Sequence, residues 1–183
     1  MKKKDQLPVY LFHQGTNYYS YNFLGSHIIE KGTVFRVWAP NAKKVHLAGS
    51  FCNWQKNPKF EMKKISKGGI WELFVEGIKE GQLYKYMITT VDNIDIYKSD
   101  PFAFSSQTRM ETASITYKSN YQWKDENWQN YKKTVNFHEM PVNIYEVNLS
   151  SWKRKENGDF YTYKEIAPLL KQTLLKPFAT LLI

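Results

Sequence analysis

Cysteine is almost missing from this sequence, because Cys52 is the only one among 183 residues. A single cysteine can form neither an internal disulfide nor a cysteine-rich metal site, and this scarcity is typical of cytoplasmic proteins. Long apolar runs are missing as well, since no stretch approaches the roughly 20 apolar residues that a membrane-spanning helix needs. The lysines at positions 2–4 are not followed by the apolar core of a signal peptide. We therefore expect a cytoplasmic protein that has no membrane partner.

The common catalytic and nucleotide-binding motifs are absent too. The sequence contains no nucleophile elbow, no G-x-G-x-x-G and no P-loop. Its four histidines are scattered, and none has the spacing of a metal site. Among the carboxylates, Glu146 lies in a candidate strand that Glu139 just precedes, and Asp100 precedes Pro101 as turn residues often do. We predict no catalytic residue, no metal and no cofactor within this chain.

Acidic residues are outnumbered, with 17 Asp and Glu against 26 Lys and Arg, a formal net charge of +9. Such a balance raises the possibility of a basic β-domain that binds nucleic acid. The lysines, however, are spread along the chain and form no stripe with helical spacing. We interpret the charge as a solvated surface and expect no nucleic-acid partner.

Aromatic residues, by contrast, are abundant at 16%, and 13 of them are tyrosines. Aromatic side chains suit the half-buried surface of a sheet, and their flat rings can also stack on sugars. Between residues 31 and 105, short segments of alternating polarity are separated by Gly, Pro and Asn, which predicts a β-sandwich. The expected strands are residues 33–38, 44–50, 70–75, 83–88 and 95–98. We expect Trp38, Trp71 and Phe74 in the core of this sandwich.

The rest of the chain divides around this sandwich. We expect an irregular or weakly helical lead-in at residues 1–30, the sandwich at 31–117 and a linker at 118–140. Residues 141–183 contain a candidate strand at 142–147 and a candidate helix that starts at Thr162, with Glu165 placed to complete a capping box. A strand followed by a loop and a helix is typical of the opening of an α/β unit. The last dozen residues are apolar and aberrant for such a unit.

Several segments, taken in order, resemble bacterial glycogen branching enzymes. The resemblance covers about residues 7–170, and the segments are residues 11–17 with 23–27, 35–42 with 45–54, 69–74 with 81–86 and 99–104, 109–114, and 144–154. It implies a mainly β fold, an immunoglobulin-like β-sandwich of the family-48 carbohydrate-binding module, followed by a truncated start of a (β/α)8 barrel. The chain departs from the family pattern at Cys52, Met110, Asn148 and Ser150.

The resemblance implies chemistry that lies outside this chain. The family cleaves α-1,4 bonds and forms α-1,6 bonds by retaining transglycosylation, which requires two carboxyl groups about 5–5.5 Å apart. These groups lie on later strands of the barrel, beyond Ile183, so the resemblance implies that this chain is inactive by itself. It also implies that the sandwich packs on its own catalytic barrel.

Carbohydrate binding is the function that the resemblance leaves to this chain. It implies that Trp54 stacks on glucose beside Asn53 and that Lys85 binds sugar hydroxyls, with α-glucan (glycogen or starch) as the partner. A second stacking Trp is missing near residues 94–97, where Tyr97 could replace it only if the fold places it well. Trp54 could instead be a packing residue. Two interpretations remain open, an N-terminal fragment of a branching enzyme and a stand-alone glycogen- or starch-binding module.

Overall fold

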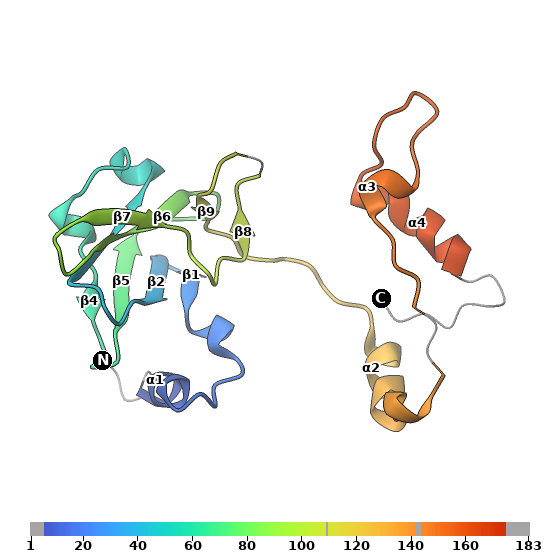
Figure 1. Ribbon diagram of the computed structural model, residues 1–183, viewed down its shortest axis with the longest axis horizontal. Helices are drawn as coiled ribbons and strands as arrows, with labels where there is room; N and C mark the ends of the chain where they lie inside the picture. The colour runs from blue at the N-terminus through green and yellow to red at the C-terminus, as the bar shows by residue number, and fades with distance from the viewer. Residues whose placement is uncertain (1–5, 109, 142–143, 175–183) are drawn as a thin grey trace. The chain divides into compact units, whose positions relative to one another are not determined.

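The computed structural model describes residues 6–108, 110–141 and 144–174. The chain divides into two compact units, Met1–Tyr121 and Gln122–Ile183, which are described separately (Figure 1). In the part of the chain that the structure describes, no helix is both long enough and apolar enough to cross a membrane.

The first unit is a β-sandwich, as the alternating sequence predicted. One sheet has the order β1 (Gly25–Ile29), β2 (Gly32–Trp38), β5 (Ile70–Glu76) and β4 (Lys63–Lys64). The other has the order β3 (Lys44–Gly49), β6 (Leu83–Thr89), β9 (Ser114–Ile115) and β8 (Ser105–Ser106), and β7 (Asp95–Lys98) also pairs with β6. All of these pairings are antiparallel, and the five expected strands are confirmed as β2, β3, β5, β6 and β7.

The core lies between the two sheets and is filled by alternate residues of each strand. Phe35 of β2, Leu47 of β3 and Tyr84 of β6 have no exposed surface. Trp71 is buried here as expected, and its indole nitrogen donates a 2.9 Å hydrogen bond to the carbonyl of Ala39. The polar edge of this large aromatic side chain is therefore paired inside the core.

The expectation that Trp38 and Phe74 lie in the core is wrong. Their exposed fractions are 51% and 46%. Side chains alternate between the faces of a strand, so the inward positions of β2 and β5 fall to Val37, Trp71 and their alternate neighbours. Trp38 and Phe74 consequently lie on the outer face of the first sheet.

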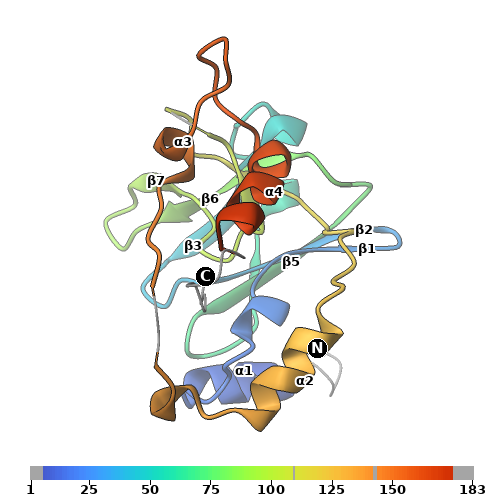
Figure 2. The ribbon, with the colours of Figure 1, turned by 90° about the vertical axis from the view of Figure 1, so that its right-hand side faces the viewer.

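Helix α1 (Gln6–His13) covers part of that outer face, and Figures 1 and 2 both place it beside the first sheet. Val9 and Phe12 of the helix belong to a second apolar cluster, which includes the fully buried Ile70. The ring of Phe12 meets Trp38 edge to face at 5.5 Å, and the Trp38 indole donates to the Gly68 carbonyl at 2.8 Å. A short 3-10 turn, Ser20–Asn22, connects α1 to β1, so residues before position 31 contribute both a helix and a strand to the unit.

A buried carboxylate joins the second sheet to the segment that follows β7. Asp100 accepts hydrogen bonds from the hydroxyls of Tyr84 at 2.6 Å and Tyr86 at 3.2 Å. Its main-chain N–H donates to Ser114 of β9, and its carboxylate also accepts from the N–H of Phe102. Burial raises the pKa of Asp100, and the hydrogen bonds that it accepts oppose that shift.

The second unit contains helices α2 (Glu126–Thr134), α3 (Leu149–Trp152) and α4 (Tyr163–Leu174), with a 3-10 turn at Phe137–Glu139. The expected helix after Thr162 is confirmed. Its capping box is present, because the N–H of Thr162 donates to Glu165 at 2.7 Å and the N–H of Glu165 donates to the Thr162 hydroxyl at 3.4 Å. Helix α2 lies within the segment predicted to be a linker.

The expected strand at residues 142–147 is not found where the structure can be described. Residues 142 and 143 lie outside the described residues, and residues 144–147 form no strand, so the prediction is wrong for these four. A strand requires a neighbour for its main-chain hydrogen bonds. Within the described residues of this unit, the pairing is limited to one bridge between Arg154 and Phe160.

Candidate functional site

The candidate stacking residue, Trp54, lies in a loop with an unusual backbone. After β3 the chain forms a 3-10 turn (Ser50–Cys52), and then Asn53 and Trp54 both adopt left-handed φ values of 51° and 60°. This conformation is uncommon for residues other than glycine and costs about 1–2 kcal/mol per residue. The loop is held by a 3.0 Å hydrogen bond from the Trp54 N–H to the carbonyl of Gly49. Strained backbone of this kind is concentrated at functional sites.

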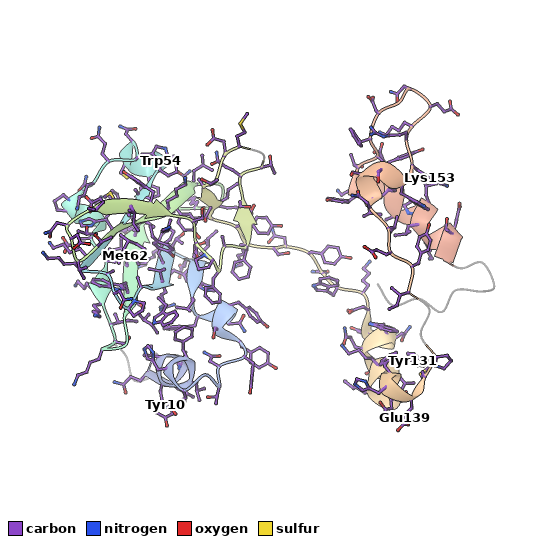
Figure 3. The ribbon with its side chains drawn as sticks, viewed as in Figure 1. Tyr10, Trp54, Met62, Tyr131, Glu139 and Lys153 are labelled. Carbon is purple, nitrogen blue, oxygen red and sulfur yellow. The ribbon has the colours of Figure 1, made fainter. Side chains whose placement is uncertain are left out.

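Tyr97 lies next to this loop. Its hydroxyl donates a 2.8 Å hydrogen bond to the main-chain carbonyl of Trp54, and 46% of its surface is exposed. Strand β7 therefore places Tyr97 beside the loop that carries Trp54. In Figure 3, Trp54 lies at the edge of the sandwich, whereas Met62 lies between its sheets.

Lys85 lies on the outer face of the second sheet, the face that also carries Tyr97. In β6, Tyr84 and Tyr86 point into the core, so Lys85 and Met87 point outward. Met87 pairs with Tyr97 across the β6–β7 ladder. Lys85 is two residues before Met87, so it lies one row away from Tyr97 on the same face. The Lys85 ammonium donates a 2.7 Å hydrogen bond to the Thr112 hydroxyl. Sequence reasoning missed Thr112, because no motif connects it to β6.

Two further residues place a charged pair beside this surface. Lys56, two positions after Trp54, donates to the carboxylate of Asp95 at 2.7 Å. This bond from Lys56 is the largest cause of the lowered pKa of Asp95. The outer face of the second sheet thus carries Tyr97 and Lys85, the loop with Trp54 adjoins Tyr97, and the ion pair of Lys56 and Asp95 lies beside them.

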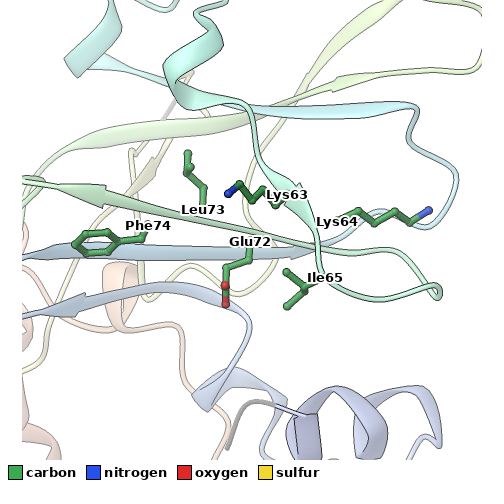
Figure 4. A pocket seen from close by; sticks show the side chains of 6 residues that line it. All are labelled: Lys63, Lys64, Ile65, Glu72, Leu73 and Phe74. Carbon is green, nitrogen blue, oxygen red and sulfur yellow. The ribbon is translucent and has the colours of Figure 1, made fainter. Parts of the chain in front are cut away.

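A separate hollow of about 580 Å³ lies on the first sheet. Figure 4 shows its lining, which comes from β4, β5 and the residue after β4: Lys63, Lys64, Ile65, Glu72, Leu73 and Phe74. None of Trp54, Asn53 or Lys85 lines it. Among these described residues, the polar ones are two lysines and one glutamate, and the aromatic one is Phe74. The face with Trp54 and Tyr97 is therefore the better candidate for a site that recognises sugar rings.

The sequence of residues 23–103 matches the family model of carbohydrate-binding module 48, the isoamylase N-terminal domain. The matched region, called the module below, is similar to this family in sequence. The module includes Trp54, Lys85 and Tyr97, and Thr112 lies just beyond it.

The chain is also similar to curated 1,4-alpha-glucan branching enzymes. It is 47% identical to the enzyme of Geobacillus stearothermophilus over 166 residues, 88% of this chain and 26% of that protein. The figures are 49% over 173 residues for Halothermothrix orenii, 90% of this chain and 27% of that protein. In sequence the chain corresponds to the N-terminal portion of these enzymes, and it spans about a quarter of their length.

Among solved structures, a putative alpha amylase from Salmonella typhimurium matches at a TM-score of 0.44. It is 23% identical, and the match covers 58% of this chain and 17% of that one.

Within the module, two of the predicted site residues are adjacent and the third lies on β6. Asn53 is exposed and adjoins Trp54 in the strained loop. Lys85 lies two residues before Met87, the residue of β6 that pairs with Tyr97. The resemblance pointed to Trp54, Asn53 and Lys85, but only the fold reveals the bond between Tyr97 and Trp54.

Proposed function

We propose that the module binds α-glucan on the outer face of its second sheet. The indole of Trp54 and the ring of Tyr97 supply flat apolar surfaces for sugar rings, and Lys85 with Asn53 supplies polar groups for hydroxyls. Binding sites commonly combine aromatic surface with a few fixed polar groups in this way. The observation that carries the proposal is the hydrogen bond from the Tyr97 hydroxyl to the Trp54 carbonyl, which fixes both residues relative to each other.

We also propose that the chain serves as the N-terminal part of a 1,4-alpha-glucan branching enzyme. The similarity to such enzymes over about 90% of the chain supports this role. In that setting α-glucan is the substrate of a retaining transglycosylase, whose two carboxyl groups belong to a catalytic barrel. We assign to this chain the binding of glucan and the packing against that barrel, and we assign no catalytic residue to it.

Packing against a barrel has a candidate surface in the second unit. The rings of Trp128 and Phe137 lie 6.0 Å apart, and Tyr131 lies 5.9 Å from Trp128. Trp128 and Tyr131 keep 41% and 46% of their surface exposed. Large aromatic side chains on a polar helix are typical of surfaces that another domain covers. The cytoplasm is the compartment that we propose, because Cys52 is the only cysteine in the sequence.

The binding proposal can be tested by electrophoresis of the full chain in native gels that contain glycogen. We expect glycogen to retard the wild type, and Trp54→Ala to reduce its affinity by at least about tenfold, as loss of an aromatic anchor often does. Phe74→Ala is the matched control, because it removes an exposed aromatic side chain from the rival hollow on the other sheet. If Phe74→Ala abolished retardation and Trp54→Ala did not, the site would lie in that hollow.

The proposal that catalysis belongs to the barrel and not to this chain is tested separately. We expect the purified full chain to form no new α-1,6 branches when it is incubated with amylose. Branch formation, detected by debranching and chain-length analysis of the product, would overturn the assignment of a binding role alone.

A further inference from the structure

The outer face of the second sheet continues past the proposed stacking residues. Across β3, β6 and β7, one row pairs His46, Met87 and Tyr97, and the next pairs Lys44, Thr89 and Asp95. Rows on one face of a sheet are about 6.6–6.8 Å apart, because every second residue faces the same way. Thr89 and Asp95 therefore lie one row beyond Tyr97, on the side away from Lys85.

Lys56 reaches this row from the loop that carries Trp54. Its ammonium donates to Asp95 Oδ2 at 2.7 Å and to the Thr89 hydroxyl at 3.3 Å, and that hydroxyl donates to Asp95 Oδ1 at 2.5 Å. These three side chains form a closed polar triad. An ammonium has three N–H donors and a carboxylate has about four acceptor positions. The bonds within the triad use two of the donors of Lys56 and two of the acceptor positions of Asp95, which leaves one donor and two acceptor positions for a ligand.

Both groups can be reached from solvent, since the side chains of Lys56 and Asp95 are 41% and 33% exposed. Beside them is an open hollow of about 620 Å³. Its lining residues come from the start of β3, the loop after it and the end of β6: Lys43, Lys44, His46, Lys56, Pro58, Glu61, Thr89 and Asn93.

The charges around this hollow decide what it can hold. Lys44 pairs with Glu61 at 3.2 Å, Lys43 donates to Asn93 at 2.5 Å, and Lys56 pairs with Asp95. Burial lowers the pKa of His46, so its imidazole is neutral at neutral pH. A phosphate would face the carboxylate of Glu61, with that of Asp95 nearby, and a metal cation would face three ammonium groups. A neutral ligand rich in hydroxyls matches both signs of charge.

We propose that the Lys56–Thr89–Asp95 triad and the hollow beside it form a second sugar subsite, which binds neighbouring hydroxyls of a further ring of the same glucan chain. The inference rests on the proposed function of the face with Trp54 and Tyr97. A pair of adjacent hydroxyls presents donors and acceptors together, and the ammonium and carboxylate of the triad present the complementary pair. The module then holds an internal stretch of a linear glucan along β6 and β7, rather than a single terminal glucose.

The side chains of the triad hold one another in place before a ligand binds. A lysine on a surface loop normally loses considerable side-chain freedom when a ligand binds. Lys56 is already held by two hydrogen bonds. Less ordering is then required when a sugar binds. The subsite consequently makes affinity depend on the length of the oligosaccharide. It strengthens the binding of sugars long enough to span both positions and leaves the binding of shorter ones unchanged.

Calorimetric titration of the full chain with maltotriose and with maltoheptaose tests this inference. We expect the wild type to bind the longer sugar about tenfold more tightly, the effect of one or two added charge-assisted hydrogen bonds. Asp95→Asn and Lys56→Met each reduce that ratio below about threefold, with maltotriose affinity unchanged. Lys59→Met is the matched control, because Lys59 is an exposed lysine of the same loop that does not line the hollow, and it keeps the ratio.

The outcomes separate the two proposals. If the wild type binds both sugars and Asp95→Asn and Lys56→Met keep the wild-type ratio, the second subsite does not exist, although the first does. Equal affinity of the wild type for both sugars leads to the same conclusion. If the wild type binds neither sugar, the proposed function fails and the subsite fails with it. Two variants are used because Asp95 belongs to a strand, whereas Lys56 lies on a loop and its substitution leaves the sheet intact.

Discussion

The hydroxyl of Tyr97 donates a 2.8 Å hydrogen bond to the main-chain carbonyl of Trp54. These residues are 43 positions apart in the sequence, and the bond joins β7 to the strained loop that follows β3. The side chain of Tyr97 is therefore tied to the backbone of the loop that carries Trp54.

Tyr97→Phe keeps the aromatic ring and removes only the hydroxyl that fixes the loop. We expect glycogen affinity to fall by about two- to tenfold, the usual value of one hydrogen bond, with little change in the melting temperature. Affinity electrophoresis gives the first quantity and thermal unfolding the second. Tyr10→Phe is the control, because Tyr10 is 60% exposed on α1. Unchanged affinity in Tyr97→Phe would mean that the loop holds its shape without the bond.

Two glycines allow a steric effect to be separated from a backbone effect. Gly69 and Gly81 have φ values of +91° and +86°, a region that costs other residues about 1–2 kcal/mol. A Cβ on Gly69 would lie 2.2 Å from the Cα of Pro40, whereas a Cβ on Gly81 meets nothing within 4 Å. We expect Gly69→Ala to lower the free energy of unfolding by about 2–5 kcal/mol and Gly81→Ala by about 1–2 kcal/mol, as measured with urea. Equal losses would show that the Pro40 segment moves aside.

The buried carboxylate of Asp100 predicts a pH dependence of stability. Burial raises its pKa in the folded protein above the unfolded value, so the stability that it contributes is fully present below the unfolded pKa and is lost as pH rises through the folded pKa. Asp100→Asn has no proton to lose at this position. We therefore expect the stability of Asp100→Asn relative to the wild type to increase from about pH 4 to about pH 7. Urea unfolding at several pH values measures this difference, with the exposed Asp92→Asn as control, and a flat difference would contradict it.

Removal of the Asp100 carboxylate also takes a hydrogen-bond acceptor out of the core. Asp100→Ala leaves the hydroxyls of Tyr84 and Tyr86, both completely buried, without their shared acceptor. We expect a loss of about 2–4 kcal/mol in the free energy of unfolding. The hydroxyl of Tyr86 keeps the Arg36 carbonyl as an acceptor at 3.2 Å. The double change that adds Tyr84→Phe is therefore expected to recover part of this loss, because it removes the Tyr84 donor together with its acceptor. No recovery would assign the loss to the volume of the Asp100 side chain.

The capping box of α4 contains a carboxylate whose pKa is lowered. The Glu165 carboxylate accepts a 2.7 Å bond from Lys155, and this bond, with those from Thr162, lowers the pKa of Glu165 to about 2. Its stabilising effect is present above the unfolded pKa and is lost as pH falls through about 2. Carbon NMR of the Glu165 carboxyl is expected to show the low titration, and Lys155→Met to move it upward. Thr162→Ala is expected to accelerate amide exchange in the first turn of α4 by about fivefold.

Alternating polarity was sufficient to predict the five longer expected strands, because each of them buries one face. It was insufficient to assign the faces of β2 and β5. Both strands have large apolar side chains on the two faces, since α1 covers part of the outer face and Ile70 is completely buried beneath it. The strands β4, β8 and β9 have two residues each and therefore have no period to detect. The failed strand at 144–147 depended on a neighbour that no local pattern can supply.

The site divides in a similar way. Trp54, Asn53 and Lys85 were proposed from the sequence because they fall within segments that resemble a known family, and their binding role stays a prediction. Thr112 and Asp95 gave no signal, since a threonine near a turn and an aspartate at the start of a strand have ordinary structural roles. Their partners, Lys85 and Lys56, are 27 and 39 positions away. Only the register of β6 and β7, together with the path of the loop after β3, brings these groups together.

Strand β6 presents the core with one set of side chains and the solvent face with the other. Tyr84 and Tyr86 point inward to Asp100, and Lys85 and Thr89 point outward. Insertion or deletion of a single residue within this strand would exchange the two sets. The turn at residues 90–94, closed by a 2.9 Å bond from the N–H of Thr90 to the carbonyl of Ile94, has no such constraint. Related chains can therefore vary in length at this turn and in side chains on the outer face, but a change of length inside β6 would remove the core and the binding surface together.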